Sequence, residues 1–253
     1  MGENAYIKGV ENRILAALPQ QEYQRLLPKM EKVFLEYHQP LFEPDQRIEH
    51  VYFPDSGVVS LLNVMENGDT AEVGLVGYEG IAGLPVFLDA DSVSSLAVVQ
   101  IEGEGMRMKT KDFREEANRQ GPLHRLLQRY TQTLLMQVSQ SAACNRFHSM
   151  DERFCRWILM SHDRVRKDTF PMTQEFVSQM LGARRPTISV VAAMLQKAEL
   201  IRYSRGKMTV LDRKGLETGS CECYRIVKND FDRLVGGNVE VEEGQDQTGQ
   251  GGL

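Results

Sequence analysis

A pair of short amphipathic segments in residues 173–200 constrains the fold of this chain more than any other feature. Thr173 can cap a first helix by accepting a hydrogen bond from an early backbone N–H. Gly182 permits the left-handed conformation that ends a helix, and Pro186 suits the first turn of a second helix, where a missing N–H is harmless. The spacing therefore predicts two helices joined by a tight turn, with the inward-facing residues Phe176, Val177, Met180, Leu181, Ile188, Val191, Ala192 and Leu195.

Basic residues accompany this helix pair. Arg184 and Arg185 begin the second helix, where the helix N-terminus attracts phosphate and an arginine can also reach the O6 and N7 atoms of guanine. Arg205 and Lys207 stand on a predicted hairpin turn between two short strands. The combination is typical of a winged helix-turn-helix that binds DNA. The helix pair alone is also compatible with a generic helical hairpin whose charged face is solvated.

The net charge of −5 is distributed unevenly along the chain. Residues 151–214 contain 13 lysines and arginines against 7 acidic residues, which leaves a local balance of +6 and −11 for the rest. A basic segment of this kind can meet DNA phosphates while the acidic remainder faces water.

Short apolar runs separated by turn signals occupy the N-terminal half of the chain. The runs at residues 51–53, 58–64, 71–76 and 96–101 have the regular spacing of an antiparallel β-sandwich. Asn67-Gly68 is a hairpin signal, because a type I′ turn needs positive φ at both central residues.

A long helix is predicted over residues 123–145. Its apolar residues recur at intervals of three and four, as the a and d positions of a coiled coil do. We interpret this row as a dimer interface, although a helix packed on its own domain fits the pattern equally well. The predicted interface residues are Leu123, Leu127, Tyr130, Leu134 and Val138.

The chain is therefore predicted to have an α+β fold in four parts. Residues 1–120 form an effector-sensing antiparallel β-sandwich or jelly roll, and residues 121–146 form the dimerisation helix. Residues 147–220 form the winged helix-turn-helix. Residues 221–253 are a C-terminal extension whose Gly-, Gln- and Glu-rich end is expected to be disordered from about residue 236.

The order of sandwich, long helix and winged helix-turn-helix resembles the Crp/Fnr family of transcription regulators over about residues 12–217. The most specific part is residues 173–201, followed by Gly206-Lys207. The motifs VYFPDSGVVS at residues 51–60 and VGYEG at residues 76–80 resemble one branch of that family. The resemblance implies a homodimer that binds an inverted-repeat DNA site, with a cyclic-nucleotide-binding-like N-terminal domain.

The resemblance also implies roles for individual residues. Arg185, Pro186 and Val190 fall on base-facing positions, and Ser189 lies on the same exposed side. Pro186 stands where a glutamate often accepts from cytosine, and Val190 stands where an arginine often sits, so the family's usual half-site is not expected. Contacts to the DNA backbone are expected from Thr173, Gln174, Arg184, Thr187, Arg205 and Lys207.

The effector pocket departs from the cyclic-nucleotide-binding pattern. Members that bind cyclic nucleotides carry a Gly-Glu pair and an Arg-Ser or Arg-Thr pair that hold the phosphate and ribose. The matching positions here are Ala82, Gly83 and Leu84, then Ser94 and Ser95, without the glutamate or the arginine. Because a buried phosphate without its cation is costly, we expect no cyclic nucleotide cofactor. The sequence names no other effector.

Other chemistries lack the residues that they need. The cysteines Cys144, Cys155, Cys221 and Cys223 include no CxxC pair, and none lies near the N-terminus, where iron–sulfur-sensing Fnr-like proteins carry most of theirs. We expect reduced thiols, with Cys144 and Cys155 as small buried hydrophobes. No His-x-His of a cupin metalloenzyme, no P-loop and no GxSxG occurs, so neither an enzyme nor a metal site is predicted.

The expected partners are double-stranded DNA, a second copy of the chain and RNA polymerase. No stretch of sequence is apolar enough to cross a bilayer, and residues 1–10 lack the pattern of a secretory signal, so we expect a cytoplasmic protein without membrane contact. The alternative is a ligand-sensing or protein-interaction module with a degenerate helix-turn-helix that does not bind DNA.

Overall fold

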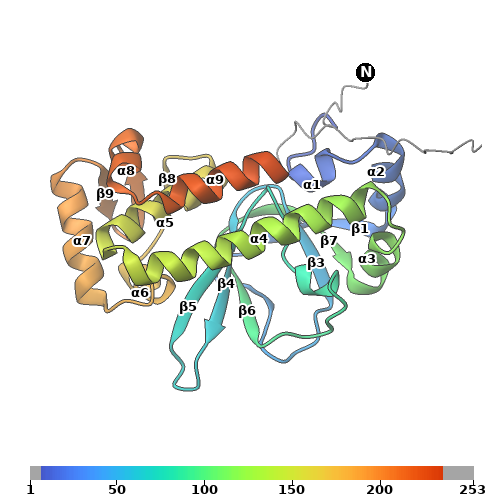
Figure 1. The fold of residues 1–253 in the computed structure, drawn as a ribbon, viewed down its shortest axis with the longest axis horizontal. Coiled ribbons are helices and arrows are strands. Elements are labelled where there is room, and N and C mark those ends of the chain that lie inside the picture. Colours follow the sequence, from blue (N-terminus) through green and yellow to red (C-terminus); the bar gives the residue numbers. More distant parts are fainter. Residues whose placement is uncertain (1–6, 236–253) are drawn as a thin grey trace, which may run out of the picture.

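The computed structural model describes residues 7–235, which form a β-rich N-terminal part, one long helix and a C-terminal helical part (Figure 1). The tail that we predicted to be disordered from about residue 236 lies outside the described residues. Within the described part, no helix has the length and apolar character needed to span a membrane.

Two antiparallel sheets build the N-terminal part, as the alternation of strands and turns predicted. One sheet has the strand order β1–β7–β3, and the other has the order β2–β6–β4–β5. We call this part the β-domain. Its elements are α1 (Arg13–Ala16), α2 (Gln20–Leu26), η1 (Leu27–Lys29), β1 (Met30–Leu35), β2 (Pro40–Phe42), β3 (His50–Pro54), β4 (Val58–Val64), β5 (Thr70–Val76), η2 (Leu84–Val86), β6 (Ser95–Ile101), β7 (Gly103–Lys109) and α3 (Thr110–Ala117).

The predicted hairpin at Asn67-Gly68 joins β4 to β5, but its turn differs from the expected type I′. Gly68 has a φ of +85°, whereas Asn67 is not among the residues with positive φ. The Met65 N–H donates to the Asp69 carbonyl at 2.8 Å, so three residues form the loop. This is the common three-residue hairpin loop, in which only the last residue needs the left-handed conformation.

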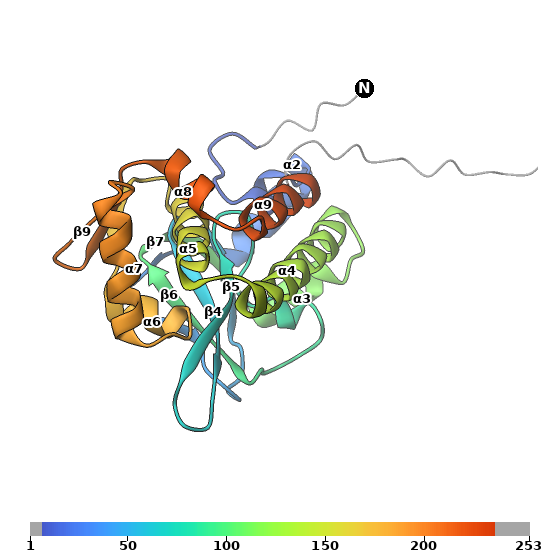
Figure 2. The ribbon, with the colours of Figure 1, turned by 60° about the vertical axis from the view of Figure 1, so that its left-hand side comes forward.

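A long helix, α4 (Pro122–Phe147), runs along the β-domain, and α9 (Cys223–Leu234) lies beside it in the opposite direction (Figures 1 and 2). The sequence predicted α4 but assigned only an extension to the residues of α9. The buried residues of α9 are Cys223, Tyr224, Val227 and Phe231, which recur on one face of the helix.

Three of the five residues predicted for the dimer interface are instead buried against the β-domain. Leu123, Leu127 and Tyr130 are fully buried within the single chain. A Cβ atom at Gly80 would lie 2.3 Å from the Tyr130 ring, so the second glycine of the VGYEG motif makes room for that side chain. The three residues therefore belong to the chain's own core. Spacing by three and four cannot distinguish a helix packed on its own sheet from a helix packed on a second copy.

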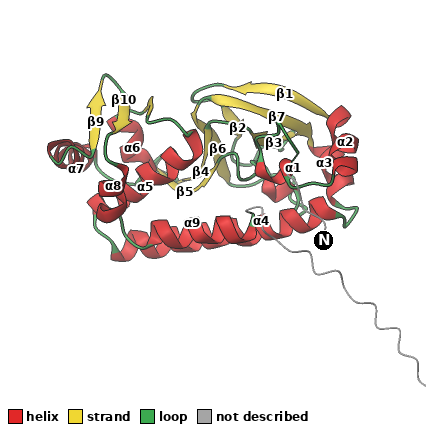
Figure 3. Ribbon diagram, turned by 90° about the horizontal axis from the view of Figure 1, so that it is seen from above, coloured by secondary structure: helices red, strands yellow, loops and turns green. Residues whose placement is uncertain are grey.

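The C-terminal part, which we call the helix-turn-helix domain, follows α4 directly. Its small sheet has the strand order β8–β10–β9 and stands beside α7 (Figure 3). Its elements are α5 (Met150–Val165), β8 (Thr169–Pro171), α6 (Gln174–Met180), α7 (Arg185–Lys197), β9 (Ile201–Ser204), β10 (Lys207–Val210) and α8 (Arg213–Gly219).

Polar side chains join α5 to the larger sheet. The Arg164 guanidinium donates to the Glu79 carboxylate at 2.7 Å, and both side chains are buried. The Gln100 amide of β6 donates to the Ser161 hydroxyl at 3.1 Å. The β-domain and the helix-turn-helix domain therefore share paired polar groups that would be costly to separate.

Glu72 on β5 belongs to the same interface. The indole N–H of Trp157, the only tryptophan of the chain, donates to Glu72 Oε1 at 2.8 Å. Glu72 Oε2 is buried without a hydrogen-bond partner among the described residues. Burial disfavours the charged carboxylate and raises the pKa of Glu72 to about 7.

Glu72→Gln should remove a pH-dependent part of the folding free energy. The pKa of Glu72 in the folded chain, about 7, lies above the ordinary value of 4.5. The stabilisation from the protonated carboxyl is therefore complete below pH 4.5 and is lost as pH rises through 7. Between pH 4.5 and pH 7, the free energy of unfolding of the wild type should fall by about 3 kcal/mol relative to that of the variant. Urea unfolding followed by Trp157 fluorescence measures this difference, and the exposed-site variant Glu66→Gln is the control. A constant difference between wild type and Glu72→Gln would contradict the assignment.

Candidate nucleic-acid interface

The first helix of the predicted pair is α6, and its cap is as the sequence predicted. The Thr173 hydroxyl accepts a hydrogen bond from the Phe176 N–H at 3.1 Å. Phe176, Val177 and Met180 are buried, and Gly182 has a φ of +57° just after the helix. The helix therefore begins and ends for the local reasons that the sequence supplies.

The second helix, α7, begins at Arg185 with Arg184 at its N-cap and Pro186 in its first turn. The predicted inward face is confirmed, because all four of its apolar residues are buried. The outward face is apolar at two positions, where Val190 is 61% exposed and Met194 is 52% exposed. Val190 was predicted to face outward, whereas Met194 was not, although it follows Val190 by four residues and so lies on the same face. The buried residues are Ile188, Val191, Ala192 and Leu195.

Polar contacts hold the outward faces of the two helices together. The Ser189 hydroxyl donates to Gln174 Oε1 at 2.7 Å. Arg185 lies 3.8 Å from Glu175, and both side chains are mostly exposed. Gln174 and Ser189, which were predicted to contact DNA, are therefore already paired with each other. In the described part of the chain, the Arg185 guanidinium has one loose surface ion pair, which contributes little and leaves it accessible.

The wing is the β9–β10 hairpin, with Arg205 and Gly206 as its two turn residues. Their φ values are +51° and +73°, as a type I′ turn requires. The Met172 N–H donates to the Gly206 carbonyl at 2.7 Å, and the Tyr203 hydroxyl donates to the Met172 carbonyl at 2.7 Å. These bonds tie the wing to the segment that enters α6, so the exposed Arg205 and Lys207 stand beside the helix pair.

The helix pair also lies against the β-domain. The rings of His38 and Phe176 meet edge to face, with their centroids 5.4 Å apart. The β4–β5 hairpin and α6 line a cleft of about 710 Å³, and its lining includes Arg184 and Arg185. The basic end of α7 is therefore next to the β-domain.

The residues of the predicted effector pocket lie at two places in the β-domain. Ala82 exchanges backbone hydrogen bonds of 2.9 Å with Tyr52, and Gly83, with a φ of +104°, precedes η2, which Leu84 begins. Ser94 is exposed, and Ser95 begins β6. The cleft described above is lined by other residues, so a pocket at these positions stays a prediction.

Comparison with known proteins agrees with this architecture. The family model of the Crp-like helix-turn-helix domain matches residues 152–218. A protein described as a Crp/Fnr-family regulator from Eubacterium rectale is 15% identical, with a TM-score of 0.64 over 82% of this chain and 95% of that one. FixK2 from Bradyrhizobium japonicum is also 15% identical, with a TM-score of 0.64 over 76% and 98%. A CRP-family regulator from Thermus thermophilus is 16% identical, with a TM-score of 0.61 over 74% and 96%. No curated protein sequence matches the chain.

These findings define the class of protein: a β-rich N-terminal domain joined through a long helix to a helix-turn-helix. Residues 152–218 form a Crp-like helix-turn-helix domain, and the chain has the fold of the Crp/Fnr transcription regulators. The resemblance to the Crp/Fnr family and the predicted fold class are confirmed, while the branch suggested by the motifs at residues 51–60 and 76–80 stays a prediction.

Cyclic AMP and cyclic GMP should bind weakly or not at all, because the positions that match the phosphate site carry serine and small apolar residues. Arg107 on β7 could supply a positive charge only by leaving its ion pair with Glu31. Isothermal titration of the full chain with each nucleotide measures the affinity. A micromolar dissociation constant would show that another residue supplies the missing positive charge.

Proposed function

We propose that the protein is a sequence-specific, DNA-binding transcription regulator that acts as a homodimer on an inverted-repeat operator. The observation that carries this proposal is the outward surface formed by α7 and the wing. It presents the exposed Arg184 and Arg185 at a helix N-terminus, with Arg205 and Lys207 on the adjoining turn. A helix N-terminus and four cations on one surface favour the DNA phosphates, while the exposed side of α7 is free to enter the major groove.

The contacts divide into those that select bases and those that hold the backbone. Arg185 can donate to O6 and N7 of guanine. Val190 and Pro186 have no side-chain donor or acceptor, so they can select only by packing, for example against a thymine methyl. Ser189 is paired with Gln174, so both would have to exchange that bond for one with DNA. Backbone contacts are assigned to Thr173, Gln174, Arg184, Thr187, Arg205 and Lys207.

Arg185→Ala and Lys207→Ala should weaken DNA binding in different ways. Arg185→Ala should cost ~1–3 kcal/mol and relax the preference at one symmetric base pair per half-site. Lys207→Ala should weaken binding to all sequences alike and reduce the slope of log K against log salt by about 0.9 per lost phosphate contact. The DNA site used in these binding measurements is first selected from a random DNA pool. We expect it to be an inverted repeat whose half-site centres are ~34 Å apart.

The matched control for these variants is Lys197→Ala, which removes an exposed cation from the opposite end of α7. It should bind the selected site almost as the wild type does. If Arg185→Ala keeps wild-type affinity and base preference, the assignment of α7 as the recognition helix is wrong.

The dimer is proposed on the solvent side of α4. The exposed residues Gln128, Gln132, Leu135 and Ser139 recur at intervals of four, three and four. The predicted interface row passes through Leu127, whereas this exposed row passes through the next residue, Gln128. The helix face that can meet a second copy is therefore rotated around α4 relative to the predicted interface. Leu135 is 62% exposed, and its neighbours Leu134 and Val138 are half-buried. An exposed leucine within a polar helix face suits the centre of such an interface.

Leu135→Arg should dissociate the dimer and leave each subunit folded, because this side chain belongs to no hydrophobic core among residues 7–235. Sedimentation equilibrium should give twice the chain mass of 28.7 kDa for the wild type and about one chain mass for the variant. Leu88→Arg is the control, because Leu88 is similarly exposed, at 59%, on a different surface. A wild type that sediments as a monomer at micromolar concentration would contradict the proposed assembly.

The same proposal makes the β-domain a sensory domain and RNA polymerase the partner of the DNA-bound dimer. Regulators with this fold act through binding and not through catalysis, and we place the protein among them. The interaction module without DNA binding is not favoured, because the cap, the turn, the buried face and the wing of a DNA-binding domain are all present.

A further inference from the structure

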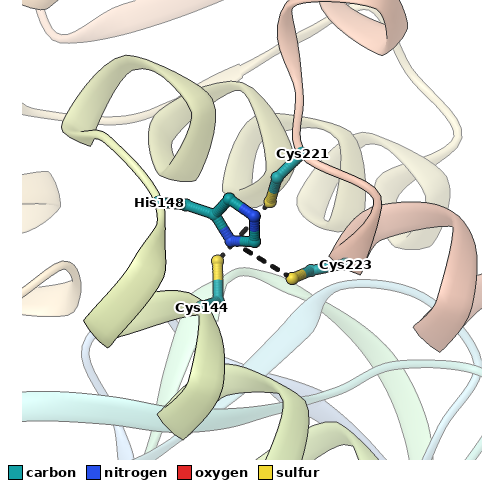
Figure 4. Close-up of side chains that lie close together, drawn as sticks. All are labelled: Cys144, His148, Cys221 and Cys223. Atoms are coloured by element: carbon teal, nitrogen blue, oxygen red, sulfur yellow. Dashed lines mark hydrogen bonds between the residues drawn. The ribbon is translucent and has the colours of Figure 1, made fainter.

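Three cysteines and one histidine meet at the junction of α4 and α9. Cys144 lies in the last turn of α4, and His148 is the residue that follows this helix. Cys221 precedes α9, and Cys223 begins it. Their ligand atoms, three sulfurs and one ring nitrogen, all lie within 4.8 Å of one another and point toward a common centre (Figure 4).

The spacing of these atoms suits one tetrahedral ion. The Cys144 and Cys221 sulfurs are 3.5 Å apart, and the Cys223 sulfur is 3.5 Å from His148 Nδ1. Zinc bonds of ~2.3 Å to sulfur and ~2.0 Å to nitrogen place tetrahedral ligand atoms roughly 3.5–3.8 Å apart. The atoms need only small movements to reach that geometry.

The cysteines of this group are not fillers of the main core. Cys155 packs within the large hydrophobic cluster that contains the rest of the core. Cys144, Cys221 and Cys223 instead form a separate buried cluster made of cysteines alone. Cys144 was predicted from the sequence to be a small buried hydrophobe, and this arrangement was not predicted. The signal available to it was the Cys144-x-x-x-His148 spacing at a helix end, which puts both side chains on one face.

A carboxylate orients the histidine for this role. His148 Nε2 lies 3.2 Å from Glu222 Oε2, while Nδ1 faces the cysteines. A carboxylate that accepts from one ring nitrogen fixes the tautomer that leaves the other nitrogen free to bind a metal. Glu222 stands between the two cysteines of the CxC pair, so the same short segment supplies two ligands and the orienting group.

A hydrogen-bond donor and two guanidinium groups also lie near these sulfurs. The Gln140 amide donates to the Cys223 sulfur at 3.0 Å. Arg153 and Arg156 lie close enough for their charges to act on Cys144, and the Nε of each is buried without a hydrogen-bond partner in the described part of the chain. Three thiolates, a neutral imidazole and a divalent ion leave one net negative charge, which a buried guanidinium offsets.

We propose that Cys144, His148, Cys221 and Cys223 bind one zinc ion, which fastens the start of α9 to the end of α4. A single ion fits better than an iron–sulfur cluster, because a cluster binds its cysteines through different iron atoms and so spreads them wider than four mutually close ligands. Four protein ligands leave no open position, as in structural zinc sites. The ion lies where the chain turns from α4 into the helix-turn-helix domain, since α5 is capped by Ser149, the residue after His148.

The test is the metal content of the full chain, purified under reducing conditions and measured by mass spectrometry of the elements. The wild type should carry one zinc per chain. Cys223→Ser and His148→Ala should lose it, and a chelator should lower the thermal midpoint of the wild type but not of these variants. Cys155→Ala is the matched control and should keep the full zinc content, because Cys155 is a buried cysteine outside the group.

Two further measurements keep the proposal falsifiable if a variant folds poorly. His148→Cys, unlike His148→Ala, should bind one zinc per chain through four sulfur ligands. Wild-type protein loaded with cobalt should show the visible absorption of a tetrahedral thiolate site. Wild-type protein that takes up no zinc after reconstitution, that holds iron with acid-labile sulfide, or that joins Cys144 to Cys221 in a disulfide under the same reducing conditions would overturn the proposal.

Discussion

The buried ion pair between Glu79 and Arg164 fixes how the two halves of this molecule sit together. Glu79 comes from the loop after β5, and its carboxylate also accepts the Gly77 N–H at 3.2 Å. Arg164 comes from α5, and its guanidinium also donates to the Met160 carbonyl and lies over the Phe231 ring of α9. Both charges depend on this geometry, because a buried ion that loses its partner costs roughly 3–5 kcal/mol. The β-domain, α5 and α9 are therefore held in one arrangement.

The same constraint gives the VGYEG motif a physical meaning. Gly77 lies so close to Arg164 that a Cβ there would be 2.7 Å from the arginine side chain, and Gly80 leaves room for Tyr130 of α4. The motif is therefore the place where α4 and α5 both meet the larger sheet. Contacts with these two helices account for both glycines of the motif and for its glutamate, which pairs with Arg164.

What the sequence could predict is the structure that depends on neighbours along the chain. The Thr173 cap, the turn at Gly182, the position of Pro186 and the Arg205-Gly206 turn each follow from local stereochemistry, and each is present. What it could not predict depends on distant partners. The face of α4 that is buried is decided by the sheet beneath it. The pairing of Ser189 with Gln174 depends on how α7 crosses α6, and α9 forms a buried face only because α4 is beside it.

The four-residue group at Cys144 shows how such long-range arrangement bears on function. Its two halves are 77 residues apart in sequence, and each half alone is an unremarkable pair. The antiparallel packing of α9 on α4 brings them together at the end of α4 nearest the helix-turn-helix domain (Figure 1). The Glu79–Arg164 pair holds α5 from the side of the sheet, and the cysteine–histidine group lies just before α5 begins. Two buried polar clusters therefore bracket α5, the helix that connects α4 to the helix pair α6 and α7.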